Sequence, residues 1–256
     1  DETIARAKFI KDFDTTKLTL SIFYADIDNG YDAFSLDNTR VTYSDEPGYD
    51  RQKTTAASVK FEKTLKNDDI IELLGSFADS KLGYAYDEDW SNTGICNNTP
   101  CDTKLFGFDW WYSSFDSFNR DNQNHTIDLR YISSFKNINW VIGLYNRDQD
   151  INLIRQYTYL ENDFKSSFDT RNSAVYGQFT NDFTNYIKLQ AGLRFEERKA
   201  DYIDNNGPAP EDFYCIAIYP KPESCLFENN YSRSENFWGG KVSLQAELTE
   251  NLMIYG

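Results

Sequence analysis

The feature that most constrains the fold is a period-two alternation of apolar and polar residues. In its clearest segment, residues 186–196, one side of an extended chain would be apolar and the other polar (Ile187, Leu189, Ala191, Leu193 and Phe195 against Lys188, Gln190, Arg194 and Glu196). Segments 17–27, 125–132 and 241–248 alternate in the same way. Such alternation is typical of strands with one apolar face and one wet face. The chain is therefore predicted to be all-β.

Short polar segments rich in Asn, Asp and Thr separate many of these strands. They lie at residues 14–16, 66–69, 136–137, 181–185 and 249–251. Residues of these types favour tight hairpin turns. Alternation with flanking turn residues predicts about ten strands in about five hairpins.

Between the hairpins, the sequence predicts long connections at residues 28–50, 80–121, 147–170 and 201–234. Because short turns and long connections alternate, all short turns would lie at one end of the sheet. That layout is typical of an antiparallel up-and-down transmembrane β-barrel, whose turns are short on the periplasmic side and long outside. A secreted β-sandwich is the alternative, but it does not require this order.

Two segments depart from a simple apolar-out, polar-in pattern. Leu74 would share a face with Glu72 and Ser76, and Val141 would share one with Asn139. A barrel interior lined partly by an inserted domain would accept these residues, and a different strand register would also explain them.

Composition supports the barrel and excludes some partners. The chain has 19 Phe, 18 Tyr and a single Met, and aromatic residues gather at both membrane interfaces of such barrels. The formal net charge of -15 argues against nucleic acid as a partner, because nucleic-acid-binding proteins carry basic stripes. It fits acidic external loops, although a solvated surface of any kind would give the same sum.

Residues 172–202 read NSAVYGQFTNDFTNYIKLQAGLRFEERKADY. This hairpin resembles TonB-dependent receptors, in which a strand with Tyr-Gly-Gln leads to one with Ala-Gly-Leu-Arg, here residues 176–178 and 191–194. Residues 237–256 resemble the next hairpin of that family, and residues 29–63 resemble an external loop with its returning strand.

The resemblance implies a bacterial outer-membrane barrel, 22-stranded in the family and plugged by an N-terminal domain. It implies import of a scarce nutrient with energy from TonB, so the expected partners are TonB, outer-membrane lipid and a small-molecule or metal-chelate ligand. Ferric siderophore is the default ligand; cobalamin and oligosaccharide are the others. Both ends fall inside strand patterns, so residues 1–256 are expected to be a partial barrel domain of about ten strands.

Two other classes of function stay open. One is a secreted all-β protein that binds or cleaves polysaccharide, and the other is a porin-like barrel that works without TonB. No enzyme, cofactor or metal site is predicted. The single histidine, His125, is expected at a strand start as a rim or girdle residue, and no Gly-x-Ser-x-Gly elbow accompanies it.

Candidate ligand-binding residues lie in the second long connection. Trp110, Trp111 and Tyr112 form an aromatic cluster, and Trp90 precedes them. They would form a stacking platform for a ligand, or they would anchor the chain at lipid headgroup level, where Trp and Tyr gather. In the same connection, the acidic run 87–89 would either bind Ca²⁺ or form part of a solvated loop.

The four cysteines are candidates for disulfides. Cys96 and Cys101 lie in the second long connection, and Cys215 and Cys225 lie in the fourth. Pairing within each connection would staple it in an oxidising compartment. Four cysteines allow three pairings, and free thiols or a zinc site are the alternatives, although the spacing does not match a zinc ribbon.

Overall fold

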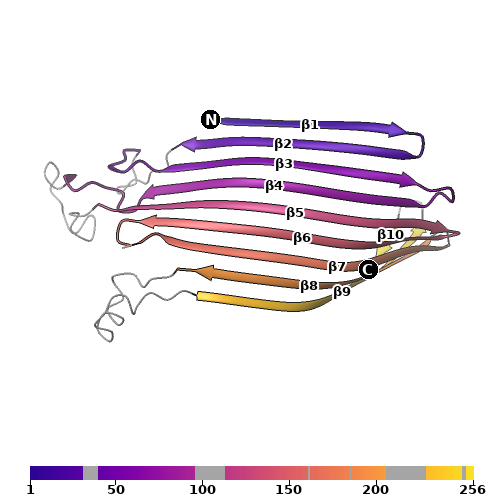
Figure 1. Ribbon diagram of the computed structural model, residues 1–256. Coiled ribbons are helices and arrows are strands. Elements are labelled where there is room, and N and C mark those ends of the chain that lie inside the picture. The colour runs from indigo at the N-terminus through magenta and orange to yellow at the C-terminus, as the bar shows by residue number, and fades with distance from the viewer. Residues whose placement is uncertain (31–39, 96–112, 161, 185, 206–228, 250–251) are drawn as a thin grey trace.

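A computed structural model describes residues 1–30, 40–95, 113–160, 162–184, 186–205, 229–249 and 252–256 (Figure 1). These residues form one antiparallel sheet of ten strands in chain order. The strands are β1 (Glu2–Phe13), β2 (Thr16–Gly30), β3 (Tyr49–Thr64), β4 (Ile70–Asp87), β5 (Phe115–Phe135), β6 (Ile138–Tyr157), β7 (Phe164–Thr184), β8 (Ile187–Asp204), β9 (Asn229–Thr249) and β10 (Leu252–Tyr255). The predicted all-β, up-and-down fold is confirmed. None of the described residues forms a helix long and apolar enough to cross a membrane.

The short turns lie where the polar segments predicted them. Asp14, Asp68 and Lys136 have positive φ values of 30°, 65° and 55°, as tight hairpin turns require. The fourth turn is narrower than residues 181–185, because β7 continues to Thr184 and β8 begins at Ile187. All strands that end in a short turn point the same way, toward the right of Figure 1.

The long connections lie at the opposite end, but the strands extend into every predicted range. The prediction for residues 147–170 is wrong in most of its length, since β6 continues to Tyr157 and β7 begins at Phe164. Arg155 pairs with Phe164 across this hairpin. The reason is that this part of the sheet is polar on one face and mixed on the other, so a strand there has the composition of a loop.

One face of the sheet carries an apolar band near the short turns. Leu73, Leu129, Leu144 and Val175 lie opposite one another on four successive strands. Their exposed fractions are 42%, 40%, 56% and 45%, so the described residues form no second layer over them. Among the described residues, the only buried apolar side chains are Ala25, Ala85, Ile95 and Ala174. The described strands form a single layer with almost no buried apolar side chains, which does not fit the β-sandwich alternative.

The other face is polar at the same height. Glu72, Arg130, Tyr176 and Arg194 occupy one row across β4 to β8, with Gly143 between Arg130 and Tyr176. Leu74 lies in the neighbouring row of this polar face, opposite Lys60 and Asp128. The departures from simple alternation therefore belong to the true register.

The strands are longer than a membrane crossing requires. β5, β7 and β9 each have 21 residues, or about 70 Å of strand. A transmembrane strand needs roughly 9–11 residues. Beyond the apolar band the same face becomes acidic, with Asp150 directly opposite Asp169. About half of each long strand thus continues past the apolar band, toward the long connections.

His125 marks the boundary between the apolar and acidic parts of this face. It lies inside β5, not at a strand start as predicted, because β5 begins ten residues earlier at Phe115. Its ring is 5.0 Å from the ring of Phe77 on β4. This position at the edge of the apolar band agrees with a girdle residue.

Candidate functional site

A chain of charged side chains crosses the polar face at the height of the apolar band. We call it the inner ladder: Lys60, Glu72, Asp128, Arg130 and Tyr176. Lys60 Nζ is 2.7 Å from Glu72 Oε2, and Arg130 Nη1 is 3.2 Å from Glu72 Oε1. Arg130 also pairs with Asp128 at 2.5 Å. Glu72 and Asp128 are 6% and 5% exposed, whereas the Lys60 and Arg130 side chains are 35% and 39% exposed, so only the acidic partners of these ion pairs are buried.

Tyr176 completes the inner ladder across a glycine. Its hydroxyl donates to Asp128 Oδ1 at 2.8 Å and accepts from Arg130 Nε at 2.9 Å. A Cβ on Gly143 would lie 2.2 Å from Tyr176 Cζ, so only glycine leaves room for the ring. The ring and Arg194 help to line a groove of about 490 Å³ on this face.

A second cluster lies on the same face at the end that carries the long connections. We call it the rim cluster: Tyr86 of β4, Asp116 and Phe118 of β5, and Arg155 and Tyr157 of β6. Arg155 forms a two-pronged pair with Asp116, with Nε–Oδ1 and Nη2–Oδ2 distances of 2.9 and 2.7 Å. The guanidinium lies 5.2 Å from the ring centres of both Phe118 and Tyr157.

The rim cluster offers the groups that a small-molecule site needs. The Tyr86 hydroxyl donates to Asp116 Oδ2 at 3.4 Å, and the Tyr84 ring lies 5.6 Å from the Tyr86 ring. Asp116 is 1% exposed. Its charge is matched by Arg155, and the aromatic rings give faces on which a planar or cationic group can stack. These residues were not predicted as a site from the sequence.

Next to the rim cluster, the chain buries several acidic and hydroxyl groups where β4 ends. Asp89 accepts a hydrogen bond from the Ser114 backbone N–H at 2.8 Å, and Glu88 accepts one from the Ser114 hydroxyl at 2.5 Å. Burial raises the pKa of Asp89 to about 6, and the nearby Asp87 side chain adds to the effect. Asp87 and Asp89 are each 2% exposed. The interpretation of this run as a solvated loop is therefore wrong for these two residues.

The sequence-predicted ligand residues are only partly described. Trp90 follows Asp89 and is 39% exposed, near the rim cluster in sequence. Trp110, Trp111 and Tyr112 lie outside the described residues. Cys96, Cys101, Cys215 and Cys225 also lie outside them. The stacking platform and the disulfides stay predictions.

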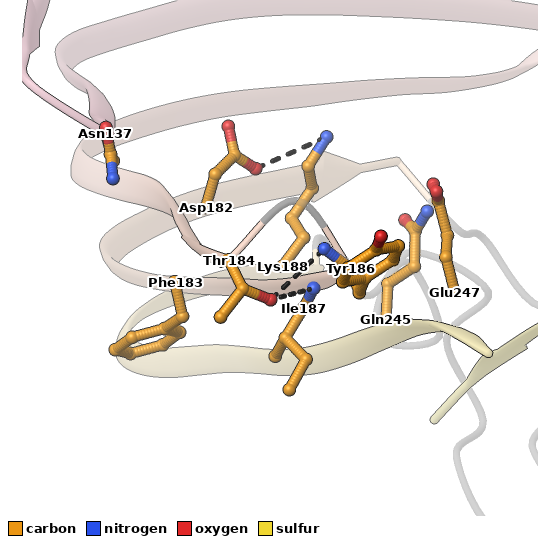
Figure 2. Close-up of a pocket in the computed structure, with 9 residues that line it drawn as sticks. All are labelled: Asn137, Asp182, Phe183, Thr184, Tyr186, Ile187, Lys188, Gln245 and Glu247. Carbon is orange, nitrogen blue, oxygen red and sulfur yellow. Dashed lines mark hydrogen bonds and ion pairs between the residues drawn. The ribbon is translucent and has the colours of Figure 1, made fainter.

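A further groove lies at the opposite end of the sheet, beside the short turn between β7 and β8 (Figure 2). Lys188 Nζ is 3.5 Å from Asp182 Oδ1 there. The Thr184 hydroxyl accepts from the backbone N–H groups of Tyr186 and Ile187, both at 3.1 Å. These bonds close the turn. The groove is far along the strands from the long connections and holds none of the predicted ligand residues.

A single meander sheet with an uncovered apolar band, a charged opposite face and long connections at one end is the wall of a transmembrane β-barrel. The family model described as TonB dependent receptor-like, beta-barrel, matches residues 6–256. The chain belongs to this family of bacterial outer-membrane receptors, which are transporters and not enzymes. The apolar band is accordingly the lipid-facing side, and the polar face lines the barrel interior.

Solved structures agree with this fold. The ferric yersiniabactin uptake receptor FyuA of Yersinia pestis has a TM-score of 0.72 at 14% identity, covering 99% of this chain and 36% of that one. The open form of the ferric-catecholate import receptor Fiu of E. coli K12 has a TM-score of 0.67 at 15% identity, covering 99% and 46%. The chain thus spans less than half the length of these structures. None of the curated proteins matches it.

Proposed function

We propose that the chain forms part of the wall of a receptor that imports a ferric siderophore across the outer membrane. Residues 1–256 would act as a partial barrel domain, with outer-membrane lipid as the partner of the apolar band. Energy would come from TonB acting on the complete receptor. The ligand would enter from the end that carries the long connections and first meet the rim cluster.

The rim cluster is the observation that supports this proposal. It places a guanidinium between aromatic rings on the interior face, at the end of the wall where the long connections begin. Ferric siderophore complexes commonly carry planar chelating groups, which can stack on aromatic rings and on a guanidinium. The similar solved structures include receptors named for ferric yersiniabactin and ferric catecholates.

Uptake of radioactive iron by the full-length receptor tests the proposal. The host strain would lack its other siderophore receptors, and a panel of ferric siderophores would be supplied one at a time. We expect uptake of at least one of them, dependent on TonB. The change Tyr157→Ala should raise the KM for uptake about tenfold, because a stacking contact of this kind is worth roughly 1 kcal/mol or slightly more.

Tyr49→Ala is the matched control for this change. Tyr49 lies at the same end of the sheet but on the opposite face, where its hydroxyl donates to Asn119 at 3.3 Å. Its loss should leave uptake unchanged. Uptake of no ferric siderophore, with TonB-dependent uptake of cobalamin or an oligosaccharide instead, would replace the ligand in the proposal. Solute passage without TonB would establish the porin-like alternative.

A further inference from the structure

The acidic group at the end of β4 (Asp87, Glu88 and Asp89) contains carboxyl oxygens that no described N–H or O–H group satisfies when Asp87 and Asp89 are both ionised. Asp87 Oδ2 accepts from the Asp45 backbone N–H at 3.1 Å, and Asp89 Oδ1 accepts from the Ser114 N–H at 2.8 Å. Within the described residues, Asp87 Oδ1, Asp89 Oδ2 and the Ser44 hydroxyl are buried and have no hydrogen-bond partner. Ser44 precedes Asp45, whose N–H binds Asp87. A buried polar atom normally has a partner, so these three atoms point to a missing one.

The charge of this group is also unbalanced. Arg155 pairs with Asp116 at 2.7 Å, so its charge is already matched by a residue outside this group. The ion pairs found across the described ranges include none to Asp87, Glu88 or Asp89. Burying a carboxylate without a counter-charge costs several kcal/mol, roughly, even after the protein relaxes. A bound cation would remove that cost.

We propose that Asp87, Asp89 and Ser44 bind a divalent cation, with Ca²⁺ as the best fit. Ca²⁺ takes only oxygen ligands, roughly six to eight of them, and accepts carboxylates, backbone carbonyls and water in irregular geometry. The described residues hold no group of three or more His, Cys, Asp or Glu side chains placed for a metal. Two carboxylates and a hydroxyl do not suit zinc, because zinc sites are built mainly from Cys and His ligands. For Ca²⁺, backbone carbonyl and water oxygens would complete the coordination shell.

The cation would fasten two long connections to the end of the sheet. Ser44 lies in the segment that precedes β3, and Asp89 lies in the segment that follows β4. These segments already touch, because the Asp45 N–H donates to the Ser91 carbonyl at 3.1 Å and Asn92 Nδ2 donates to the Tyr43 carbonyl at 2.9 Å. Gly48 also lies so close to β4 that a Cβ would be 2.0 Å from the Ala85 carbonyl oxygen.

Terbium luminescence tests this site directly. Tb³⁺ occupies Ca²⁺ sites and is excited by a nearby tryptophan, and Trp90 is the chain neighbour of Asp89. The probe would be added to full-length receptor refolded in detergent micelles free of lipopolysaccharide and treated with a chelator. We expect Trp-excited luminescence that Ca²⁺ displaces. The double change Asp87→Asn, Asp89→Asn should weaken binding at least tenfold.

The pair Asp150→Asn, Asp169→Asn provides the matched control. It removes the same number of charges from two exposed aspartates that face each other on β6 and β7. Binding should survive this change. The proposal is overturned if the receptor gives no Ca²⁺-displaceable signal, or if the control pair abolishes the signal while the site pair does not.

A second measurement covers the case in which the double variant does not fold. Asp89→Asn alone keeps an oxygen for the Ser114 N–H, so it should fold and still lose Ca²⁺ affinity. In the unmodified receptor, Ca²⁺ should slow proteolysis within residues 40–48 and 88–95 several-fold, and a chelator should reverse the effect. If protection follows pH and ignores Ca²⁺, the two carboxyls share a proton instead and the cation proposal fails.

Discussion

Replacing Gly143 with alanine should break the inner ladder without touching any charged residue. Gly143 lies on β6 between Arg130 and Tyr176, and the added Cβ would lie 2.2, 2.4 and 2.6 Å from Tyr176 Cζ, Oη and Cε1. These distances are far below van der Waals contact, so the ring must leave its place. Its hydroxyl then loses both Asp128 and Arg130.

The expected cost follows from these contacts. Overpacking of a filled site costs about 1–3 kcal/mol, and a hydrogen bond to a charged partner contributes about 1.5–3 kcal/mol. If the Tyr176 ring moves, the overpacking is relieved but the hydrogen bonds of its hydroxyl are lost. The two energies are therefore alternatives and do not add. We expect Gly143→Ala to lower the free energy of unfolding by about 2–3 kcal/mol.

Urea unfolding of the full-length receptor from lipid vesicles would measure the change. Gly177→Ala is the control, because a Cβ there would meet its nearest neighbour, the Val141 carbonyl oxygen, at 3.5 Å. The double change Gly143→Ala, Tyr176→Ala removes the clash together with the ring. If Gly143→Ala costs as much when Tyr176 is alanine as when it is tyrosine, the clash is not the cause and the reasoning is refuted.

Three other outcomes are expected. Leu144→Arg should lower the unfolding free energy by about 2–4 kcal/mol, because a charge on the lipid face is costly near the bilayer centre. The control Asp150→Arg, on the acidic part of the same face, should change the unfolding free energy little in the same urea assay. Intact-mass and peptide mapping of the unreduced receptor should find Cys96 linked to Cys101 and Cys215 linked to Cys225; crossed pairs or free thiols would contradict the stapled connections. Hydrogen bonds from Ser133 and Tyr131 hold the pKa of Asp69 below its ordinary 3.8, so the stability it gives the turn at residues 65–69 is present at neutral pH and is lost on acidification below that value. The protection factors of the amides in this turn, which are exchange rates corrected for the intrinsic effect of pH, should therefore fall at low pH in the unmodified receptor. An identical profile for Asp69→Asn would show that the carboxylate has no such role.

The sheet was predictable from sequence where a strand lies in the membrane. There the lipid imposes a strict alternation, as at Leu193, which lies opposite Gly177 with its apolar neighbours on the same face. The strand ends were not predictable for the same reason. Past the apolar band both faces meet water, so residues 147–157 lose the alternation and look like a loop. They nevertheless pair with β5 throughout and with β7 as far as Arg155.

The candidate site was less accessible to sequence reasoning. Tyr86, Asp116 and Arg155 are far apart in the chain and become neighbours only through the register of β4, β5 and β6. Asp116 lies opposite Tyr157, and Arg155 lies opposite Phe118 in the neighbouring row of the same face. Assigning that register first, then searching for opposite charges in neighbouring rows of one face, would have found the Asp116–Arg155 pair. The acidic run 87–89 was visible, but sequence could not show that Asp87 and Asp89 are buried, since burial there depends on the segment before β3.

The rim cluster and the inner ladder lie far apart on the interior face, so we expect them to affect different steps of transport. Asp116 in the rim cluster and Arg130 in the inner ladder are both on β5, about 14 residues or roughly 48 Å of strand apart. The His125 boundary lies between them, so the rim cluster is beyond the apolar band and the inner ladder is within it. A small ligand cannot touch both at once. Changes in the rim cluster should therefore alter the KM for uptake, whereas changes in the inner ladder should alter the maximal rate through barrel stability or ligand passage, with the KM preserved.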